Sequence, residues 1–290
     1  MSERRDEPAP DGRERRPAAR QAALRRLSGS TGIRRSVAGA RGCYQHATDV
    51  ELMHRSMGFA ALGLVTLVPL LIVMAAANPL PEDVAYPGFG GWIVDAMGIS
   101  GRSAASVQDL FTAPRQVLST TSAFSLAILA VFGLTFASSV QTGYAKIWGL
   151  TVGAWHRAWR GTIWLAVLSL YLFGMAASRD LPLDSASHSV IRVVVIVIGG
   201  WLFFWWSPYF LLGGRVPARF LSPGAIATIV GLVGLRLFST LVFAPLIVSN
   251  AVTYGTVGTL LVVESWLIGA GFVIFGGALL GHELVTGAMD

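Results

Sequence analysis

The feature that most constrains this chain is a pair of long apolar stretches near its C-terminus, joined by a short polar loop. The first stretch opens at Pro223 and Gly224, the loop covers Ser249–Gly255, and the second stretch reaches Gly281. Each stretch exceeds the about 20 residues that a helix needs to cross about 30 Å of hydrocarbon. The pattern predicts a membrane hairpin.

Each arm of this hairpin carries one charged residue. Arg236 lies near the middle of the first arm, and Glu264 lies near the start of the second. An isolated charge inside a membrane helix costs about 2.5 to 3.5 kcal/mol on insertion scales. Because the two residues lie at similar depths, counted from opposite ends of the hairpin, we predict that both face the bundle interior and form a charge-assisted contact. The alternative is that each charge reaches the membrane interface or has another partner.

The composition extends the membrane interpretation to most of the chain. Hydrophobic residues make up 53% of the sequence and charged residues 13%, which is outside the range of soluble globular proteins. Four further apolar stretches are predicted to span the membrane: about 58–77, 123–140, 161–177 and 190–212. We therefore predict an all-α fold, in which residues 43–290 form a polytopic membrane bundle of six transmembrane helices.

The basic residues of the loops predict the orientation of the bundle. Seven of them lie on one side: Arg41, Arg55, Lys146, Arg157, Arg160, Arg215 and Arg219. Four lie on the other: Arg102, Arg115, Arg179 and Arg192. Because loops rich in lysine and arginine stay in the cytoplasm, both termini are predicted to be cytoplasmic. Arginine far outnumbers lysine, which is typical of a GC-rich genome and suggests a bacterial plasma-membrane protein.

The N-terminal segment differs from the rest of the chain. Residues 1–42 are rich in arginine, with Pro, Gly and Ser between the charges and almost no apolar side chains. Such a segment cannot bury enough surface to fold, so we predict a disordered cytoplasmic tail that helps to set the orientation. The alternative is a tail that contacts anionic lipid headgroups or nucleic acid. Acidic residues dilute its positive charge, and we expect no nucleic-acid partner.

The longest predicted loop, residues 78–120, lies on the external side. Its apolar residues are spaced like two short amphipathic helices, broken near Gly101. We predict a connector that lies on the outer surface, and the alternative is a lid over a binding site.

Two further patterns in the spans have structural interpretations. The aromatic run Trp201–Trp206 falls near the cytoplasmic end of a predicted span, where a belt at the headgroup level explains it without a ligand. Gly277 and Gly281 have the spacing of small residues that permits close approach of two helices.

Residues that carry chemistry are scarce. The five histidines show no zinc-protease spacing, and the chain contains no phosphate-binding glycine loop of the Walker type. Cys43 is the only cysteine, which excludes an intramolecular disulfide and a thiol-based zinc site. We expect no catalytic residues, no metal site and no cofactor, and we expect that the chain is not an enzyme.

Polar side chains in and beside the spans are the candidates for a transport site or another intramembrane polar site. They are Arg236, Glu264, Tyr254, Gln141, Ser239 and Thr240. They suggest a protein that moves or senses an envelope-related small molecule, ion or lipid. The competing interpretation is a structural or scaffold protein of the envelope, in which these side chains only bond between packed helices. Its partner is the lipid bilayer in both cases, and the sequence leaves a homo-oligomer open.

Four stretches resemble one family of bacterial inner-membrane proteins, the YihY/BrkB family, whose older members were labelled ribonuclease BN. Val65–Leu71 is similar to the family pattern Leu-Ser-Leu-x-Pro-Leu-Leu, and Gly143–Trp148 to its Leu-Asn-x-Ile-Trp turn. Arg215–Ala225 resembles its basic loop and Pro-Gly-Ala helix entry. Thr253–Gly258, followed by Trp266, resembles its Tyr-Gly-Ser-Leu-Gly loop and the tryptophan of its last helix.

The resemblance covers about residues 45–283 in the expected order. It implies six helices with cytoplasmic ends, and it adds no support for ribonuclease activity. The chain departs from the family at Leu279, where a Gly-Ala-Glu pattern would place an acid, and at Glu264, which the family pattern does not include.

Overall fold

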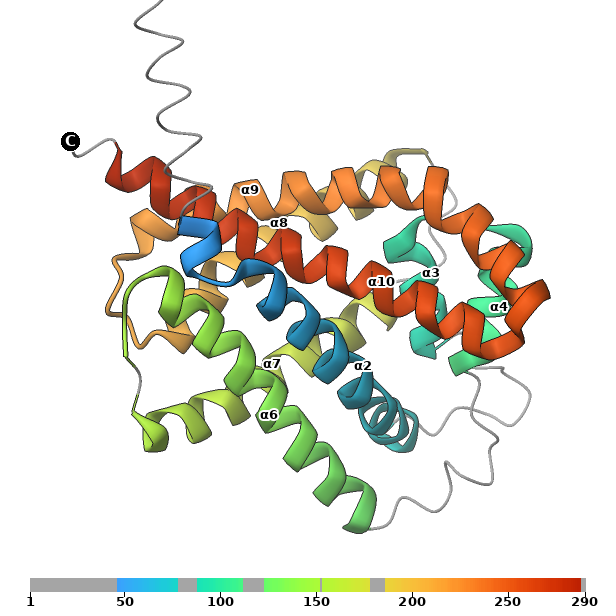
Figure 1. Ribbon diagram of the computed structural model, residues 1–290, viewed down its shortest axis with the longest axis horizontal. Coiled ribbons are helices and arrows are strands. Elements are labelled where there is room, and N and C mark those ends of the chain that lie inside the picture. Colours follow the sequence, from blue (N-terminus) through green and yellow to red (C-terminus); the bar gives the residue numbers. More distant parts are fainter. Residues whose placement is uncertain (1–45, 78–87, 112–122, 152, 178–185, 288–290) are drawn as a thin grey trace, which may run out of the picture. The chain divides into compact units, whose positions relative to one another are not determined.

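The fold is known from a computed structural model, which describes residues 46–77, 88–111, 123–151, 153–177 and 186–287 (Figure 1). The chain divides into two units, residues 1–46 and 47–290. The account below concerns the second unit. The predicted disordered tail, residues 1–42, and its predicted lipid contact lie outside the described residues.

Helices account for the secondary structure of the described residues, which contain no strand, so the predicted all-α class is confirmed. The long helices are α2 (Leu52–Ala77), α6 (Ala123–Ile147), α7 (Ala154–Ala177), α8 (Ala186–Leu211), α9 (Ala218–Phe238) and α10 (Ala244–Thr286). The short elements are α3 (Gly88–Met97), α4 (Gly101–Phe111) and the π-helix η1 (Ser239–Phe243). Each stretch predicted to span the membrane falls almost entirely within long helices. Among the described residues, the helical stretch Ala218–Thr286, which contains both arms of the hairpin, is the one long and apolar enough to cross a membrane.

The predicted C-terminal hairpin is present, but its turn differs from the prediction. Helices α9 and α10 run side by side (Figure 1). The sequence predicts a loop over Ser249–Gly255, whereas the structure remains helical to Tyr254 and reverses at Gly255. Gly255 has φ 62° and ψ −142°, a conformation that glycine adopts without the clash a side chain would cause. The prediction assigned residues 249–254 to a loop because a run of polar residues in the sequence is typical of loops, although here it lies within a helix.

The two arms approach most closely through glycine. A Cβ atom on Gly281 would lie 2.5 Å from Cα of Gly224, and one on Gly277 would lie 2.8 Å from the backbone nitrogen of Thr228. The predicted role of the Gly277 and Gly281 spacing, close helix approach, is confirmed at the crossing of α9 and α10.

The junction between α9 and α10 is a π-helix with an identifiable cause. Pro245 lacks a backbone N–H, and its ring would clash with the carbonyl of the residue four positions earlier, Leu241. The wider turn of η1, Ser239–Phe243, comes directly before the proline and accommodates it. The helix direction changes here (Figure 1).

Helices α3 and α4 coincide with the two predicted amphipathic helices, and the structure shows what covers their apolar faces. Ile93, Met97 and Val107 have no exposed surface, because they pack in a core with residues of α2, α7 and α10. The sequence predicts a connector that lies on the outer surface, and that position stays a prediction, whereas the cover of these apolar faces is protein. An amphipathic pattern shows that one face is covered, but a membrane surface and a protein core cover it equally well.

A second core lies among α6, α7, α8 and the start of α9. Phe136, Trp164 and Leu211 are buried in it, and Phe203–Trp206 pack against it. The ring of Phe203 stacks on Tyr171 with centroids 5.0 Å apart. Much of the aromatic run that the sequence predicts as an interfacial belt therefore packs against protein.

Candidate functional site

The candidate site centres on Arg236, close to the end of α9. Its guanidinium Nη1 donates a hydrogen bond to the carbonyl oxygen of Asp95. Asp95 belongs to the last turn of α3, where backbone carbonyls have no partner within the helix. The arginine therefore connects α9 to the C-terminal end of α3.

The end of α3 has a defined geometry. Gly98 has φ 69°, its N–H donates to the carbonyl of Asp95 at 3.0 Å, and the N–H of Ile99 donates to that of Val94 at 3.1 Å. This pair of bonds around a glycine in the left-handed region is a Schellman motif. A cation at this position interacts favourably with the negative end of the helix dipole.

Gly98 also lets the side chains of the site approach. A Cβ atom there would lie 3.0 Å from Cγ of Arg236, 3.2 Å from its Nε and 3.3 Å from Cγ2 of Thr240. Arg236 and Thr240 therefore meet over the backbone of Gly98. A second bond holds the same region, because Oγ of Ser103 in α4 donates to the carbonyl of Ala244 at 2.8 Å. Sequence reasoning missed Ser103, since nothing in its neighbourhood marks a partner 141 residues away.

Ser239 and Thr240 occupy the first two positions of η1. Ser239 is fully buried and donates to the carbonyl of Leu235 at 2.7 Å. Thr240 is exposed and donates to the carbonyl of Leu237 at 2.8 Å. The structure thus brings together three of the predicted site residues, Arg236, Ser239 and Thr240.

The predicted contact between Arg236 and Glu264 is wrong. Both residues lie in the described part of the chain, and no ion pair joins them. Glu264 is about two turns before Gly271 on α10, and the face of Gly271 lies against Ser56 and Phe59 of α2. Half-buried Glu264 therefore belongs to the face of α10 that is turned towards α2.

Arg236 belongs to a face with different neighbours. It lies about two turns after Ile229 on α9, and Ile229 packs against Gly200 of α8. Leu235, next to Arg236, packs against Gly269, so Glu264 lies about one turn nearer the tip of the hairpin than Arg236 does. The two charges also lie on faces that point to different neighbours. Depth along a helix can be counted from the sequence, whereas rotation about its axis depends on which neighbours it packs against.

The two remaining predicted site residues lie elsewhere. Tyr254 is 66% exposed at the tip of the hairpin. Gln141 is fully buried in α6, and its Nε2 donates to the carbonyl of Leu211 at 2.6 Å. Leu211 is the last residue of α8, so Gln141 caps that helix and contributes to the packing of α6 against α8.

Arg160 of α7 acts on the same helix end as Gln141. Its Nη1 donates to the carbonyl of Phe210 at 3.3 Å. The N–H of Gly213 donates to that same carbonyl at 3.1 Å, and the N–H of Gly214 donates to the carbonyl of Tyr209 at 2.9 Å. The sequence predicts only an orientation role for Arg160, so its capping role is a finding of the structure.

Most other hydroxyl groups in the helices bond within their own helix. Oγ1 of Thr135 donates to the carbonyl of Val131 at 2.7 Å, and Oγ of Ser169 to that of Leu165 at 2.8 Å. Ser265 bonds to Leu261 in the same way. An exception joins two helices, because the indole N–H of Trp164 donates to Oγ of Ser207 at 2.6 Å.

The described residues are all helical and include one stretch long and apolar enough to cross a membrane, which fits the class of helical membrane proteins. A family model described as "Virulence factor BrkB" matches residues 43–285. The chain belongs to the YihY/BrkB family, which confirms the resemblance seen in the sequence and identifies an integral membrane protein. No curated protein and no solved structure matches the chain.

Proposed function

We propose that this chain is a multi-pass protein of the bacterial plasma membrane that moves or senses an envelope-related small molecule, ion or lipid. In this proposal six helices cross the membrane, both termini are cytoplasmic, and the group formed by Arg236, Ser239 and Thr240 is the polar site. The observation that carries the proposal is an exposed arginine on an apolar helix, directly before a π-helix. Charged residues inside membrane helices and π-helices are both associated with functional sites.

The surroundings of Arg236 support a role in ligand binding. Its neighbours Val233, Leu237 and Phe238 are exposed apolar side chains. Among the described residues, the carbonyl of Asp95 accepts one of the five N–H bonds that a guanidinium offers. The other donors remain available to a ligand with an acceptor group. The α3 contact holds the guanidinium in place, which lowers the entropy lost on binding.

A scaffold protein without a transport cycle is the second candidate. It is favoured by the hydroxyl groups of Thr135, Ser169 and Ser265, which bond to their own helices and so line no shared path. In both proposals the bilayer is the partner, and neither involves enzyme chemistry, a cofactor or nucleic acid. A homo-oligomer is compatible with both.

Reconstitution into liposomes tests the choice between these candidates. The probes are fluorescently labelled phosphatidylglycerol and phosphatidylethanolamine, quenched from outside, and a pH-sensitive dye inside the vesicles. A transporter makes labelled lipid of the inner leaflet accessible or allows a proton flux, and Arg236→Leu abolishes this activity. Arg102→Leu, which removes an exposed arginine from α4, is the matched control and retains it. If the labelled lipid of the inner leaflet stays protected from the external quencher and the internal pH does not change, the result supports the scaffold and overturns transport of these probes.

The proposed topology has a separate test. In a Cys43→Ser background, Thr253→Cys at the hairpin tip reacts with a membrane-impermeant maleimide in intact cells. Thr151→Cys, in the loop between α6 and α7, reacts only after the cells are permeabilised. The reverse pattern would overturn the orientation.

A further inference from the structure

An apolar stripe runs along the open side of α9 and ends beside Arg236. Its members are Ile226, Val230, Val233 and Leu237, which are 53, 66, 51 and 63% exposed. Because these residues are three or four positions apart, they lie on one face of the helix. Their exposure shows that none of the described helices covers this face. In a membrane, the α9 stripe therefore meets acyl chains.

Arg236 stands at the edge of the α9 stripe, one position before Leu237. On its other side it contacts α3, through its hydrogen bond to the carbonyl of Asp95 and its approach to Gly98. Exposed Thr240 lies over Gly98 as well. Among the described residues, no acid forms an ion pair with Arg236, whose bond is to a backbone carbonyl. An apolar face thus ends at a positive charge that has further N–H donors to offer.

The position of Arg236 along α9 corresponds to the depth of a lipid headgroup. The preceding charged residue of the helix is Arg219, 17 residues earlier, or about 25 Å at about 1.5 Å per residue. With Arg219 at one surface of a hydrocarbon core about 30 Å thick, Arg236 lies about 5 Å below the other, within reach of its own side chain. Ile226 lies about 15 Å deeper than Arg236, which is the acyl depth of one leaflet.

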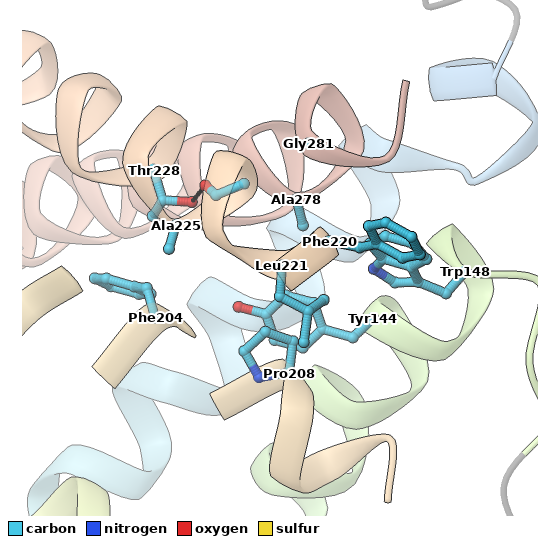
Figure 2. Close-up of a pocket in the computed structure, with 11 residues that line it drawn as sticks. Tyr144, Trp148, Phe204, Pro208, Phe220, Leu221, Ala225, Thr228, Ala278 and Gly281 are labelled. Atoms are coloured by element: carbon cyan, nitrogen blue, oxygen red, sulfur yellow. Dashed lines mark hydrogen bonds between the residues drawn. The ribbon is translucent and has the colours of Figure 1, made fainter. Parts of the chain in front are cut away.

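The hollow at the opposite end of α9 offers no comparable space. It lies beside Leu221, Gly224 and Thr228, where aromatic side chains of α6 and α8 meet small residues of α9 and α10 (Figure 2). It has room for about one water molecule. A lipid cannot enter this hollow, whereas the α9 stripe is open along its whole length.

We propose that Arg236 and the α9 stripe bind one anionic phospholipid of the outer leaflet. The lipid phosphate accepts hydrogen bonds from guanidinium N–H groups that the carbonyl of Asp95 does not use, and one acyl chain lies along Val233, Val230 and Ile226. The positive charge selects an anionic over a zwitterionic headgroup, and the length of the stripe selects a lipid over free phosphate. The inference deepens the proposed function and rests on it, because it takes Arg236 as the polar site and places this end of α9 outside.

Photolabelling of the full chain in phosphatidylcholine liposomes tests this proposal. The probes are phosphatidylglycerol and phosphatidylcholine, each with a diazirine in one acyl chain and added in trace amounts. Mass spectrometry of peptides then gives the labelling of residues 226–237, relative to the segment around Leu170, an exposed apolar residue of α7. Arg236→Gln removes the charge, and Arg236→Lys keeps it. Arg102→Gln, at an exposed arginine of α4, is the matched control.

We expect phosphatidylglycerol to label the α9 stripe about fivefold more than phosphatidylcholine, as the attraction of one basic side chain for an anionic headgroup implies. Arg236→Gln abolishes this preference, Arg236→Lys retains most of it, and Arg102→Gln leaves it unchanged. Equal labelling by the two probes in the unmodified chain overturns the proposal. A preference that survives Arg236→Gln, or that Arg102→Gln abolishes as well, also overturns it, because the attraction would then not depend on Arg236.

This test is separable from the liposome assay of the proposed function. A preference for phosphatidylglycerol without movement of lipid or protons leaves the inference standing and overturns transport. Movement of lipid or protons together with equal labelling by the two probes overturns the inference alone.

Discussion

Two helix ends in this protein are closed by the same chemistry in very different surroundings. Helix α3 ends at Gly98, with Arg236 donating to the carbonyl of Asp95. Helix α8 ends at Gly213, with Arg160 donating to the carbonyl of Phe210. In each case a glycine with positive φ follows the helix, and the arginine binds the carbonyl that also accepts the glycine N–H.

The difference lies in what else supports each end. At α8, Gln141 donates to the next carbonyl, that of Leu211, and both Leu211 and Leu212 are buried. At α3, the arginine side chain that binds the carbonyl of Asp95 is exposed. A capped end inside a core, with two donors, stabilises the fold. A capped end with one exposed arginine leaves donors for a ligand, so the same local geometry supports packing in one place and a candidate site in the other.

The largest effect is expected at the buried end. In Gly213→Val, the valine would have to adopt φ 78°, which side chains disfavour, and its Cβ would lie 2.8 Å from Cζ of Arg160. Strain and the displaced arginine together should lower the free energy of unfolding by about 3 kcal/mol. Thermal unfolding in detergent measures the loss. Gly149→Val is the matched control, because Gly149 has φ 59° and nothing within 4 Å of the added Cβ. Equal losses in the two variants would show that Arg160 does not support the end of α8.

The exposed end should tolerate the equivalent change better. In Gly98→Val, φ 69° is similarly strained, but the added Cβ meets the flexible stem of Arg236 at 3.0 Å. An exposed side chain can move aside, so the loss should be about 1 to 2 kcal/mol, mostly from backbone strain. A loss as large as that of Gly213→Val would mean that the two ends are equally rigid and would remove the contrast between them.

Gln141→Leu tests the second donor at the buried end. The substitution leaves the carbonyl of Leu211 without its side-chain donor in a buried position, and it also removes the unpartnered Oε1 of the glutamine. The net loss of stability should be about 1 to 2 kcal/mol. Thr142→Val, at an exposed neighbouring position that bonds within α6, is the control and should change little. A neutral Gln141→Leu variant would show that Arg160 alone is sufficient.

The smallest expected effect is the coupling between Arg236 and Glu264. Because the two side chains lie on faces with different neighbours, Arg236→Leu and Glu264→Leu should have additive effects on stability, within about 0.5 kcal/mol. A double-mutant cycle on thermal unfolding measures the coupling. A larger coupling would show that the charges meet in the membrane and would relocate the candidate site to the interior of the hairpin.

Much of the local structure could be predicted, and the reasons for the misses are specific. The apolar stretches and the two amphipathic segments were predicted as helices correctly, because the spacing of apolar residues indicates which face of a helix is buried. The hairpin tip was missed because Asn250 and Thr253 bond to carbonyls within the helix, which their polarity does not reveal. The group around Arg236 was predicted in part, because a charge in an apolar helix is conspicuous, whereas Asp95 contributes only a backbone carbonyl that every residue possesses.

The sequence by itself determined the all-α class, the long apolar helices, the close approach at Gly277 and Gly281, and the membership of the YihY/BrkB family. These follow from the length, periodicity and order of residues along one helix or one loop. Only the tertiary structure decided that α3 and α4 pack in a core, that Arg236 binds α3 rather than Glu264, and that Gln141 and Arg160 close α8. The rotation of each helix about its axis is set by the simultaneous packing of its neighbours, and that information is not contained in any single stretch of the chain.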